Sequence, residues 1–206
     1  MAQTEKGRIL VTKKEIDKIK DSLSALIGLP LQDISRIEAT LYLNFGRLIP
    51  VKGVILRDEN GAVLRDESGN AQFEENMCGE YSLTTLSSMR FVCGNDVVFA
   101  KSDIFLPTDE QLNQEDFVWR TFDWVTPGNT IFDELLERHF HGDFSEYVVK
   151  NVKVGAFGDL IIAFENDFVL EFFADGSGYS ENWRFGETNS TESLIVTSKG
   201  IIDDTP

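Results

Sequence analysis

Cysteine and histidine are scarce in this sequence. Cys78 and Cys93 are the only cysteines among 206 residues, and their number and spacing match neither a zinc-binding knuckle nor a disulfide framework. The two histidines, His139 and His141, would point to different sides of a helix, unlike the paired zinc ligands of a metalloprotease. We therefore expect reduced, structural thiols and no metal site.

Long apolar runs and catalytic signatures are also missing. Apolar segments such as residues 159–164 are interrupted by charges well before the roughly 18 residues that a membrane-spanning helix needs. Residues 1–10 lack the apolar core and small-residue cleavage site of a signal peptide, so we expect a cytoplasmic protein. The chain has no phosphate-binding loop, dinucleotide fingerprint or nucleophile elbow, which predicts no cofactor and no recognisable catalytic residue.

Basic residues are few compared with acidic ones. The chain has 19 Lys and Arg against 35 Asp and Glu, for a net charge of −16. The first thirty residues carry six basic and four acidic side chains, so the remainder carries −18. Such a field repels nucleic acids and anionic membranes and attracts cationic surfaces. We expect a basic protein as the partner; the alternative is that the carboxylates only maintain solubility.

Two segments have the pattern of amphipathic helices. In residues 11–28, Thr12 and Glu15 form a capping box, apolar residues follow at helical spacing, and Gly28 is a stop signal. A second helix is predicted to begin at Asn129 or Thr130 and to end at Gly142. Both helices should pack on the rest of the protein through one apolar face.

Most of the remaining chain alternates with the period of β-strands. Residues 34–45 read as one strand that Gly46 ends, and the Asn60-Gly61 turn is predicted to join residues 51–56 to residues 62–65 in a hairpin. We expect four antiparallel strands within residues 146–186. A fifth is expected at residues 193–198, and the chain after it is expected to fray.

The strand patterns suggest an internal duplication. Leu41, Leu43 and Phe45 match Leu160, Ile162 and Phe164, and an Arg-Phe strand follows each set, at Arg90 and at Arg184. We therefore predict an α+β fold in which two related antiparallel β-meander halves, each with a helix, pack as one compact unit. The first half is residues 1–128, with a hairpin insertion, and the second is residues 129–206.

The duplication would place Arg90 and Arg184 at equivalent positions. One interpretation is structural: each arginine pairs with a carboxylate such as Glu80 or Glu181. The other is functional: the two arginines, with Glu181 and Trp183 beside the second, flank a cleft between the halves.

Residues 107–128 form the longest predicted loop, which is both acidic and aromatic. Aromatic side chains supply large contact areas in protein interfaces, and neighbouring carboxylates favour a cationic partner. Asp116, Trp119, Asp123 and Trp124 are the candidate binding residues. The alternative is that the aromatic rings of this loop fill the gap between the two sheets.

The order of several short motifs resembles a group of uncharacterised small, acidic, cytoplasmic bacterial proteins of the kind found beside toxin genes. The motifs are YSL at 81–83, SDIF at 102–105, FDW at 122–124, GNTIFDE at 128–134 and WRF at 183–185. That group carries a tryptophan before the first arginine, where this chain has Met89. The resemblance implies an immunity protein and no specific chemistry.

These observations together favour a non-catalytic protein that binds a basic partner, in the manner of an immunity protein or antitoxin. The alternative is a small-molecule-binding module or an enzyme with carboxylates and arginine in a cleft between the halves. Nothing in the sequence sets an oligomeric state.

Overall fold

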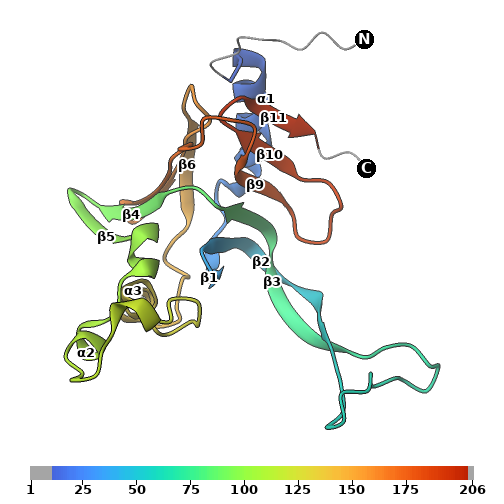
Figure 1. Ribbon diagram of the computed structural model, residues 1–206. Helices are drawn as coiled ribbons and strands as arrows, with labels where there is room; N and C mark the ends of the chain where they lie inside the picture. Colours follow the sequence, from blue (N-terminus) through green and yellow to red (C-terminus); the bar gives the residue numbers. More distant parts are fainter. Residues whose placement is uncertain (1–10, 204–206) are drawn as a thin grey trace.

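Two antiparallel β-sheets and a few short helices make up the structure, a computed structural model that describes residues 11–203 (Figure 1). The six-stranded sheet has the order β1-β2-β3-β9-β10-β11 and the five-stranded sheet the order β5-β4-β8-β7-β6. With 19% helix and 44% strand, the fold is α+β, as predicted. The elements, in chain order, are α1 (Lys13–Leu23), η1 (Ser24–Leu26), β1 (Leu31–Ile37), β2 (Thr40–Ile55), β3 (Phe73–Thr85), β4 (Met89–Cys93), β5 (Asp96–Ala100), η2 (Lys101–Phe105), α2 (Asp109–Leu112), η3 (Trp119–Thr121), α3 (Ile131–Phe140), β6 (Val149–Val154), β7 (Leu160–Phe164), β8 (Phe168–Phe172), β9 (Glu181–Glu187), β10 (Leu194–Thr197) and β11 (Gly200–Asp203).

Both predicted helices form and begin at the predicted caps. Thr12 is the N-cap of α1, and the Glu15 carboxylate accepts a 2.9 Å hydrogen bond from the Thr12 backbone N–H, which completes the capping box. Thr130 caps α3 in the same way with Asp133. His141, in the left-handed conformation with φ of 48°, is the C-cap of α3, directly before Gly142. None of the helices that the structure describes has the length and apolar character to span a lipid bilayer.

Several strand predictions were wrong in detail. Residues 34–45 are not one strand, because a tight turn with φ of 52° at Glu38 separates β1 from β2. Gly46 does not end β2 but lies in a bulge, where its φ of 85° suits glycine, and the strand continues to Ile55. Residues 51–55 pair with the start of β3, and the Asn60-Gly61 turn closes a shorter hairpin than predicted, in which Arg57 pairs with Val63 and the Leu64 N–H donates to the Leu56 carbonyl. Gly200–Asp203 forms the edge strand β11, where fraying was expected.

The chain crosses from one sheet to the other twice, after β3 and after β8. The four strands predicted within residues 146–186 therefore do not form a single meander, since β9 joins the six-stranded sheet. Asn182 ties the crossings together: its carbonyl accepts from the backbone N–H groups of Leu86 and Ser87 at 3.1 and 3.2 Å. Its side chain accepts from the Ser87 hydroxyl and donates to the Ser198 hydroxyl, both at 3.0 Å. This buried network fixes the place where the two sheets exchange strands.

The strand order of the two sheets is the same when β1–β5 are matched with β6–β10. The order β1-β2-β3-β9-β10 then corresponds to β6-β7-β8-β4-β5. Each predicted half, residues 1–128 and 129–206, contributes strands to both sheets, so the halves are intertwined. This order agrees with a duplication in which the halves exchange their last strands; the relatedness of the halves itself stays a prediction.

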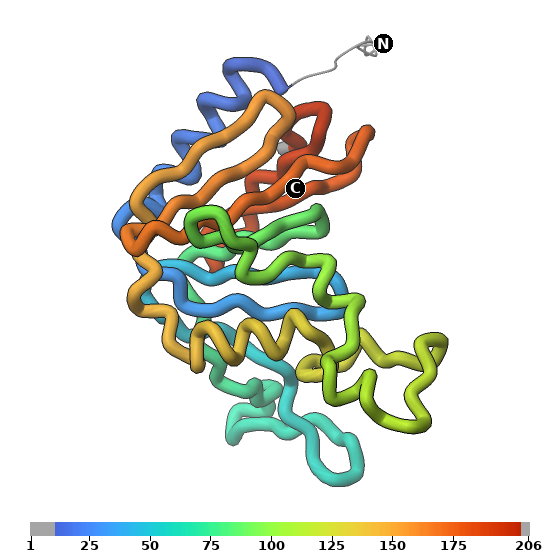
Figure 2. Tube along the Cα trace, turned by 90° about the vertical axis from the view of Figure 1, so that its left-hand side faces the viewer, coloured from blue at the N-terminus to red at the C-terminus, as the bar shows by residue number. Residues whose placement is uncertain are grey.

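The hydrophobic core lies between the two sheets and continues under α1 and α3. Core side chains alternate along the strands, as Leu41, Leu43 and Phe45 do in β2. Phe91, fully buried in β4, stacks on Phe99 of β5 at a centroid distance of 5.1 Å. Two segments project from this body at the same end of the molecule: the distal part of β2 and β3, and the chain around α2 (Figures 1 and 2).

Candidate functional site

The acidic, aromatic segment predicted from the sequence forms one of these projections. We call residues 105–128 the acidic lobe. It contains only the short helices α2 and η3, and its five acidic residues against one arginine give a net charge of −4. Six large apolar side chains of the lobe are exposed, by between 41% and 59% of their surface: Phe105, Leu106, Leu112, Val118, Trp119 and Val125.

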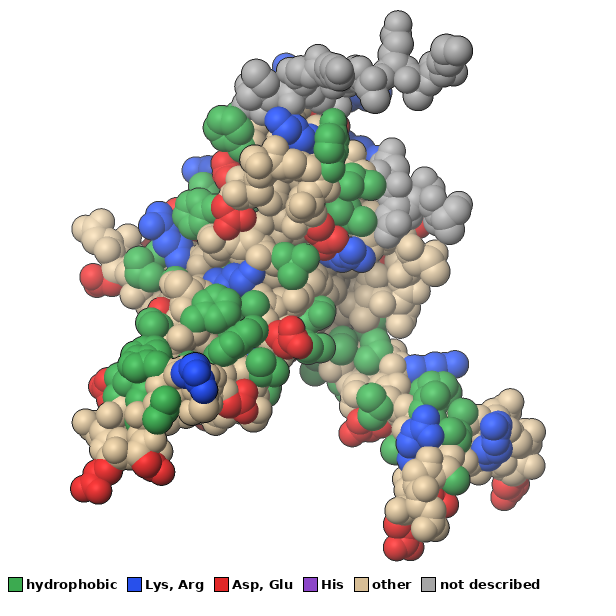
Figure 3. All heavy atoms as spheres, in the orientation of Figure 1, with side chains coloured by type: hydrophobic (Ala, Val, Ile, Leu, Met, Phe, Trp, Pro, Cys, Tyr) green, Lys and Arg blue, Asp and Glu red, His purple; other side chains and the backbone are tan. Residues whose placement is uncertain are grey.

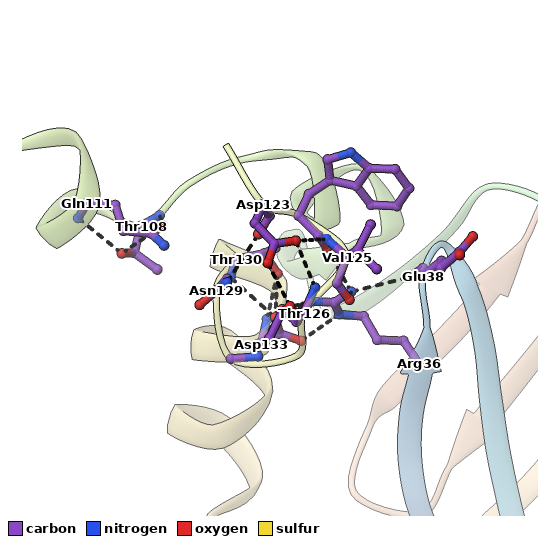
Figure 4. A network of polar contacts seen from close by, with 12 residues as sticks. Arg36, Glu38, Thr108, Gln111, Asp123, Val125, Thr126, Asn129, Thr130 and Asp133 are labelled. Atoms are coloured by element: carbon purple, nitrogen blue, oxygen red, sulfur yellow. Dashed lines mark hydrogen bonds and ion pairs between the residues drawn. The ribbon is translucent and has the colours of Figure 1, made fainter. Parts of the chain in front are cut away.

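Arg36 anchors the acidic lobe to the body (Figure 4). Its buried guanidinium donates two hydrogen bonds to the Asp133 carboxylate at the start of α3, at 2.7 and 2.6 Å. It also donates to three consecutive carbonyls of the lobe, those of Trp124 at 2.9 Å, Val125 at 3.2 Å and Thr126 at 3.0 Å. One side chain of β1 therefore fixes the end of the lobe and the start of α3 together.

Asp133 is held by this anchor and by its own helix cap. Its carboxylate accepts from the backbone N–H of Gly128 at 2.9 Å and from the Thr130 hydroxyl at 2.8 Å. Burial alone would raise the pKa of Asp133, but the hydrogen bonds and charge of Arg36 and the bond from Thr130 outweigh it, and the pKa lies below the usual 3.8. The carboxylate is thus charged and satisfied, which is the condition of a structural ion pair.

Asp123, a predicted binding residue, shapes the lobe from within. Its carboxylate accepts from the Thr126 hydroxyl at 2.6 Å and from the backbone N–H groups of Val125 and Thr126 at 3.0 and 3.2 Å (Figure 4). These bonds, led by the one from the Thr126 side chain, lower the pKa of Asp123. Asp123 is exposed but committed to this turn.

The aromatic side chains of the lobe divide between the two roles that the sequence left open. Trp124 is half-buried against the core, with its ring 5.1 Å from that of Phe105. Trp119 is 59% exposed and packs edge-on against Phe117, with centroids 5.5 Å apart; Phe122 lies 6.2 Å from Phe117. Trp119 therefore presents most of its ring to solvent on top of a small aromatic cluster.

Two exposed acidic residues directly precede this cluster in the chain. Asp116 precedes Phe117, is exposed, and has exposed Glu115 beside it. In the space-filling view, apolar and acidic side chains gather together over the projection that contains α2 (Figure 3). The arrangement combines an apolar contact area with negative charge, which suits a cationic surface.

The structure separates Arg90 from Arg184, the two arginines predicted to be equivalent. Arg90 lies in the five-stranded sheet, pairs with Glu171 on the neighbouring strand β8, and lies 5.1 Å from the ring centre of Phe173. Arg184 lies in the six-stranded sheet and donates two hydrogen bonds to Glu181 at 2.7 and 2.6 Å. The partner predicted for Arg184 is thus present, whereas Arg90 pairs with Glu171 and not with Glu80.

Trp183 belongs to the core. Its indole is fully buried in β9, and its N–H donates a 2.8 Å hydrogen bond to the carbonyl of Gly158. Trp183 is therefore not available for contact with a partner at the surface. A shallow groove of about 390 Å³ crosses the outer face of the same sheet and includes Arg184, Tyr42 and Asn44. The pairing of Arg184 with Glu181 leaves this groove without converging charges.

Sequence reasoning missed Arg36 and Lys101. Arg36 occupies a core-facing position two residues after Ile34, a place where a buried arginine needs a carboxylate partner. Lys101 is 9% exposed and donates to the carbonyl of Leu86 at the crossing between the sheets. Burial lowers the pKa of Lys101, and the charge of Asp175 partly opposes this. Both side chains tie segments of the fold together.

Within residues 11–203, no group of three or more histidine, cysteine, aspartate or glutamate side chains is placed to hold a metal ion. Cys78 and Cys93, on β3 and β4, are free thiols. No protein-family model matches the chain, and neither a curated protein nor a solved structure is significantly similar to it.

Proposed function

We propose that this protein is a non-catalytic binding protein that recognises a basic protein through the acidic lobe. The observation that carries the proposal is the coincidence, on one projection, of a net charge of −4 and six exposed large apolar side chains. Exposed apolar patches on soluble proteins mark interaction sites, and the carboxylates around this one select for a cationic partner.

The anchoring of the lobe supports this proposal. Arg36 and Asp133 fix its end, and Asp123 holds a turn inside it, so Trp119 and its neighbours are displayed by a preordered backbone. Preordering reduces the entropy lost on binding, which strengthens an interface of modest area. The exposed Trp119 is the expected anchor residue, since tryptophan is enriched among the residues that dominate interface energies.

An immunity or antitoxin role toward a basic toxin in the bacterial cytoplasm is the specific form of this proposal. The long-range field of the protein would speed association, and the buried aromatic contacts would set the lifetime of the complex. The resemblance of the sequence motifs to proteins found beside toxin genes supports this form.

The test is a charge reversal on the lobe. Glu115→Lys with Asp116→Lys leaves the hydrogen bonds of Asp123 and Asp133 in place, whereas a change at Asp123 would also disturb the loop. The matched control is Asp17→Lys with Asp21→Lys on the exposed face of α1. It changes the net charge by the same amount, at a place far from the lobe (Figure 1).

The measurement is the association rate with a purified basic protein first captured at low salt and identified by mass spectrometry. We expect the lobe variant to reduce the rate about tenfold at low ionic strength and the control to change it much less. Equal effects of the two variants, or a rate that does not depend on salt, would refute the proposal.

A further inference from the structure

The second projection has a backbone built to hold its shape. We call residues 47–79 the arm: it comprises β2 and β3 beyond the Gly46 bulge and the turns between them. At its tip, three backbone hydrogen bonds form a ring, from Leu56 N–H to the Gln72 carbonyl, from Gln72 N–H to the Leu64 carbonyl and from Leu64 N–H to the Leu56 carbonyl, each 2.9 Å. The ring joins the arm's stem to two small hairpins in a three-way junction.

The two small hairpins repeat each other residue by residue. The carboxylates of Asp58 and Asp66 each accept two backbone N–H hydrogen bonds at 2.9 Å inside their own turns. Arg57 and Arg65, one position earlier, donate to the carbonyls of Gly61 and Gly69 at 2.8 and 2.7 Å. The eight-residue repeat in the sequence is therefore a structural repeat that closes the tip of the arm.

The arm continues the core-facing side of the six-stranded sheet beyond the end of the core. In β3 the alternation that buries Leu83 leads to Met77 and Phe73, and register places Pro50 opposite Met77 and Ile55 opposite Phe73. Met77 is 56% exposed and Ile55 41% exposed, because no described element packs on them. The apolar stripe of the arm consists of Leu48, Pro50, Ile55, Phe73 and Met77, and the cross-strand pair of Lys52 and Glu75 divides it on the same face. The Lys52 ammonium lies 5.3 Å from the centre of the Phe73 ring.

The edges of the arm are less suited to an interaction than this stripe. Beyond the bulge, neither β2 nor β3 has a second strand partner among the described residues. However, Pro50 lacks an N–H, and Lys52, Glu74 and Glu75 place charges along the strands. Proline and charged residues are the usual protection of exposed strand edges against strand addition.

The exposed apolar side chains of the protein concentrate on the arm and the acidic lobe. Eleven of the nineteen large apolar side chains that are exposed in residues 11–203 belong to these two projections, which comprise 57 residues. Both projections extend from the same end of the body and border one open space (Figure 3). Soluble monomeric proteins rarely expose this much apolar surface in one region unless it takes part in an interaction.

We propose that the apolar stripe of the arm is a second contact surface for the basic protein that the acidic lobe binds. A stable interface takes about 20–30 residues from each partner. The lobe has 18 exposed residues, counted over all its sides. A partner that binds the lobe from one side therefore contacts fewer residues than a stable interface needs. The stripe supplies the missing area. The proposal rests on the proposed function and commits to one partner held by both projections.

The experiment uses a photo-crosslinking amino acid, p-benzoylphenylalanine, placed in living cells in the full-length chain. It replaces Trp119 on the lobe, Met77 on the stripe or, as a control, Phe157, which is 51% exposed beside the start of α1 at the other end of the molecule. We expect the Trp119 and Met77 positions to crosslink the same basic protein and the Phe157 position to crosslink no such protein.

Its outcomes separate the two proposals. A basic protein crosslinked at Trp119 but not at Met77 overturns the role of the arm and leaves the lobe's function standing. No basic protein at Trp119 overturns the proposed function. A different protein at Met77, or a second copy of this chain there, overturns the arm's role as well.

Affinity measurements with the identified partner add a second readout. Met77→Ser should raise the dissociation constant about tenfold, since interface anchors commonly cost more than 1 kcal/mol on truncation. Val54→Ser is the matched control, because Val54 is 69% exposed on the same arm but alternates to the side opposite Ile55. Equal effects of the two variants would contradict the proposal. Thermal melting checks that both variants remain folded.

Discussion

The Arg36–Asp133 ion pair gives the sharpest test of how this fold is held together. Asp133→Asn keeps the size of the side chain and one oxygen that can cap α3, but it removes the charge that faces the guanidinium. Arg36 would then lie 2% exposed without a counter-ion, and its N–H groups would meet an amide N–H₂ in place of one carboxylate oxygen.

The expected cost follows from the burial of the pair. Side-chain exposures of 2% for Arg36 and 13% for Asp133 place the pair among buried ion pairs. Breaking such a pair by changing one partner costs about 3–5 kcal/mol, and the carbonyls that surround Arg36 favour the lower end. A loss of about 3 kcal/mol would lower the melting temperature of a protein of this size by roughly 6–12 °C.

Urea unfolding followed by circular dichroism measures this cost, and hydrogen exchange shows whether residues 122–130 open first. The control is Glu134→Gln, because Glu134 is the next residue of α3 and pairs with Arg138 on the exposed surface. Such surface pairs contribute only about 0.3–0.5 kcal/mol. If Asp133→Asn lost no more free energy of unfolding than Glu134→Gln, the anchor would have no energetic role and the reasoning would be wrong.

Acid titration provides a second readout of the same pair. The pKa of Asp133 is lower in the folded protein than its usual 3.8, so its stabilising contribution is present above pH 3.8. That contribution is lost as the pH falls through the folded-state pKa. Asp133→Asn should therefore flatten the pH dependence of stability in this acidic range.

Two further predictions concern the arm root and a half-buried histidine. Gly79→Ala would place a methyl group 2.5 Å from the backbone oxygen of Phe45 and should destabilise the protein by about 2–3 kcal/mol in urea unfolding; Gly178→Ala, with open space around it, should be close to neutral. Burial, assisted by the charge of His141, lowers the pKa of His139 below 6.5, so stability should decline as the pH falls from about 6.5 through the folded-state pKa. His139→Leu should abolish that decline, and a decline that persists would contradict the assignment.

The local elements were readable from the sequence because their signals are local. The capping residues Thr12 and Thr130 mark both long helices, and alternation along residues such as Leu41 and Leu43 marks the strands. A capping box or a strand period depends on side chains within a few residues of one another. These signals were sufficient for the α+β class and for the acidic, aromatic character of the loop that became the lobe.

The arrangement of these elements depended on contacts between distant residues. Arg36 meets Asp133 across 97 positions, and with 35 acidic residues in the chain nothing local selects that partner. The same holds for Asn182, whose hydrogen bonds to Thr85 and Ser87 fix where the chain changes sheets. The alternation of apolar and polar residues along the sequence indicates that a strand exists, but it does not indicate which strand lies beside it.

Exposure of the candidate residues was likewise a property of the tertiary structure. Trp119 and Trp124 lie five residues apart in similar acidic surroundings, yet Trp119 is exposed and Trp124 packs against the core. By itself, the sequence determined the composition of the lobe, its charge and its turns. Only the tertiary structure decided which aromatic rings of the lobe face solvent, because burial is set by the segments that meet at a side chain and not by its neighbours in the chain.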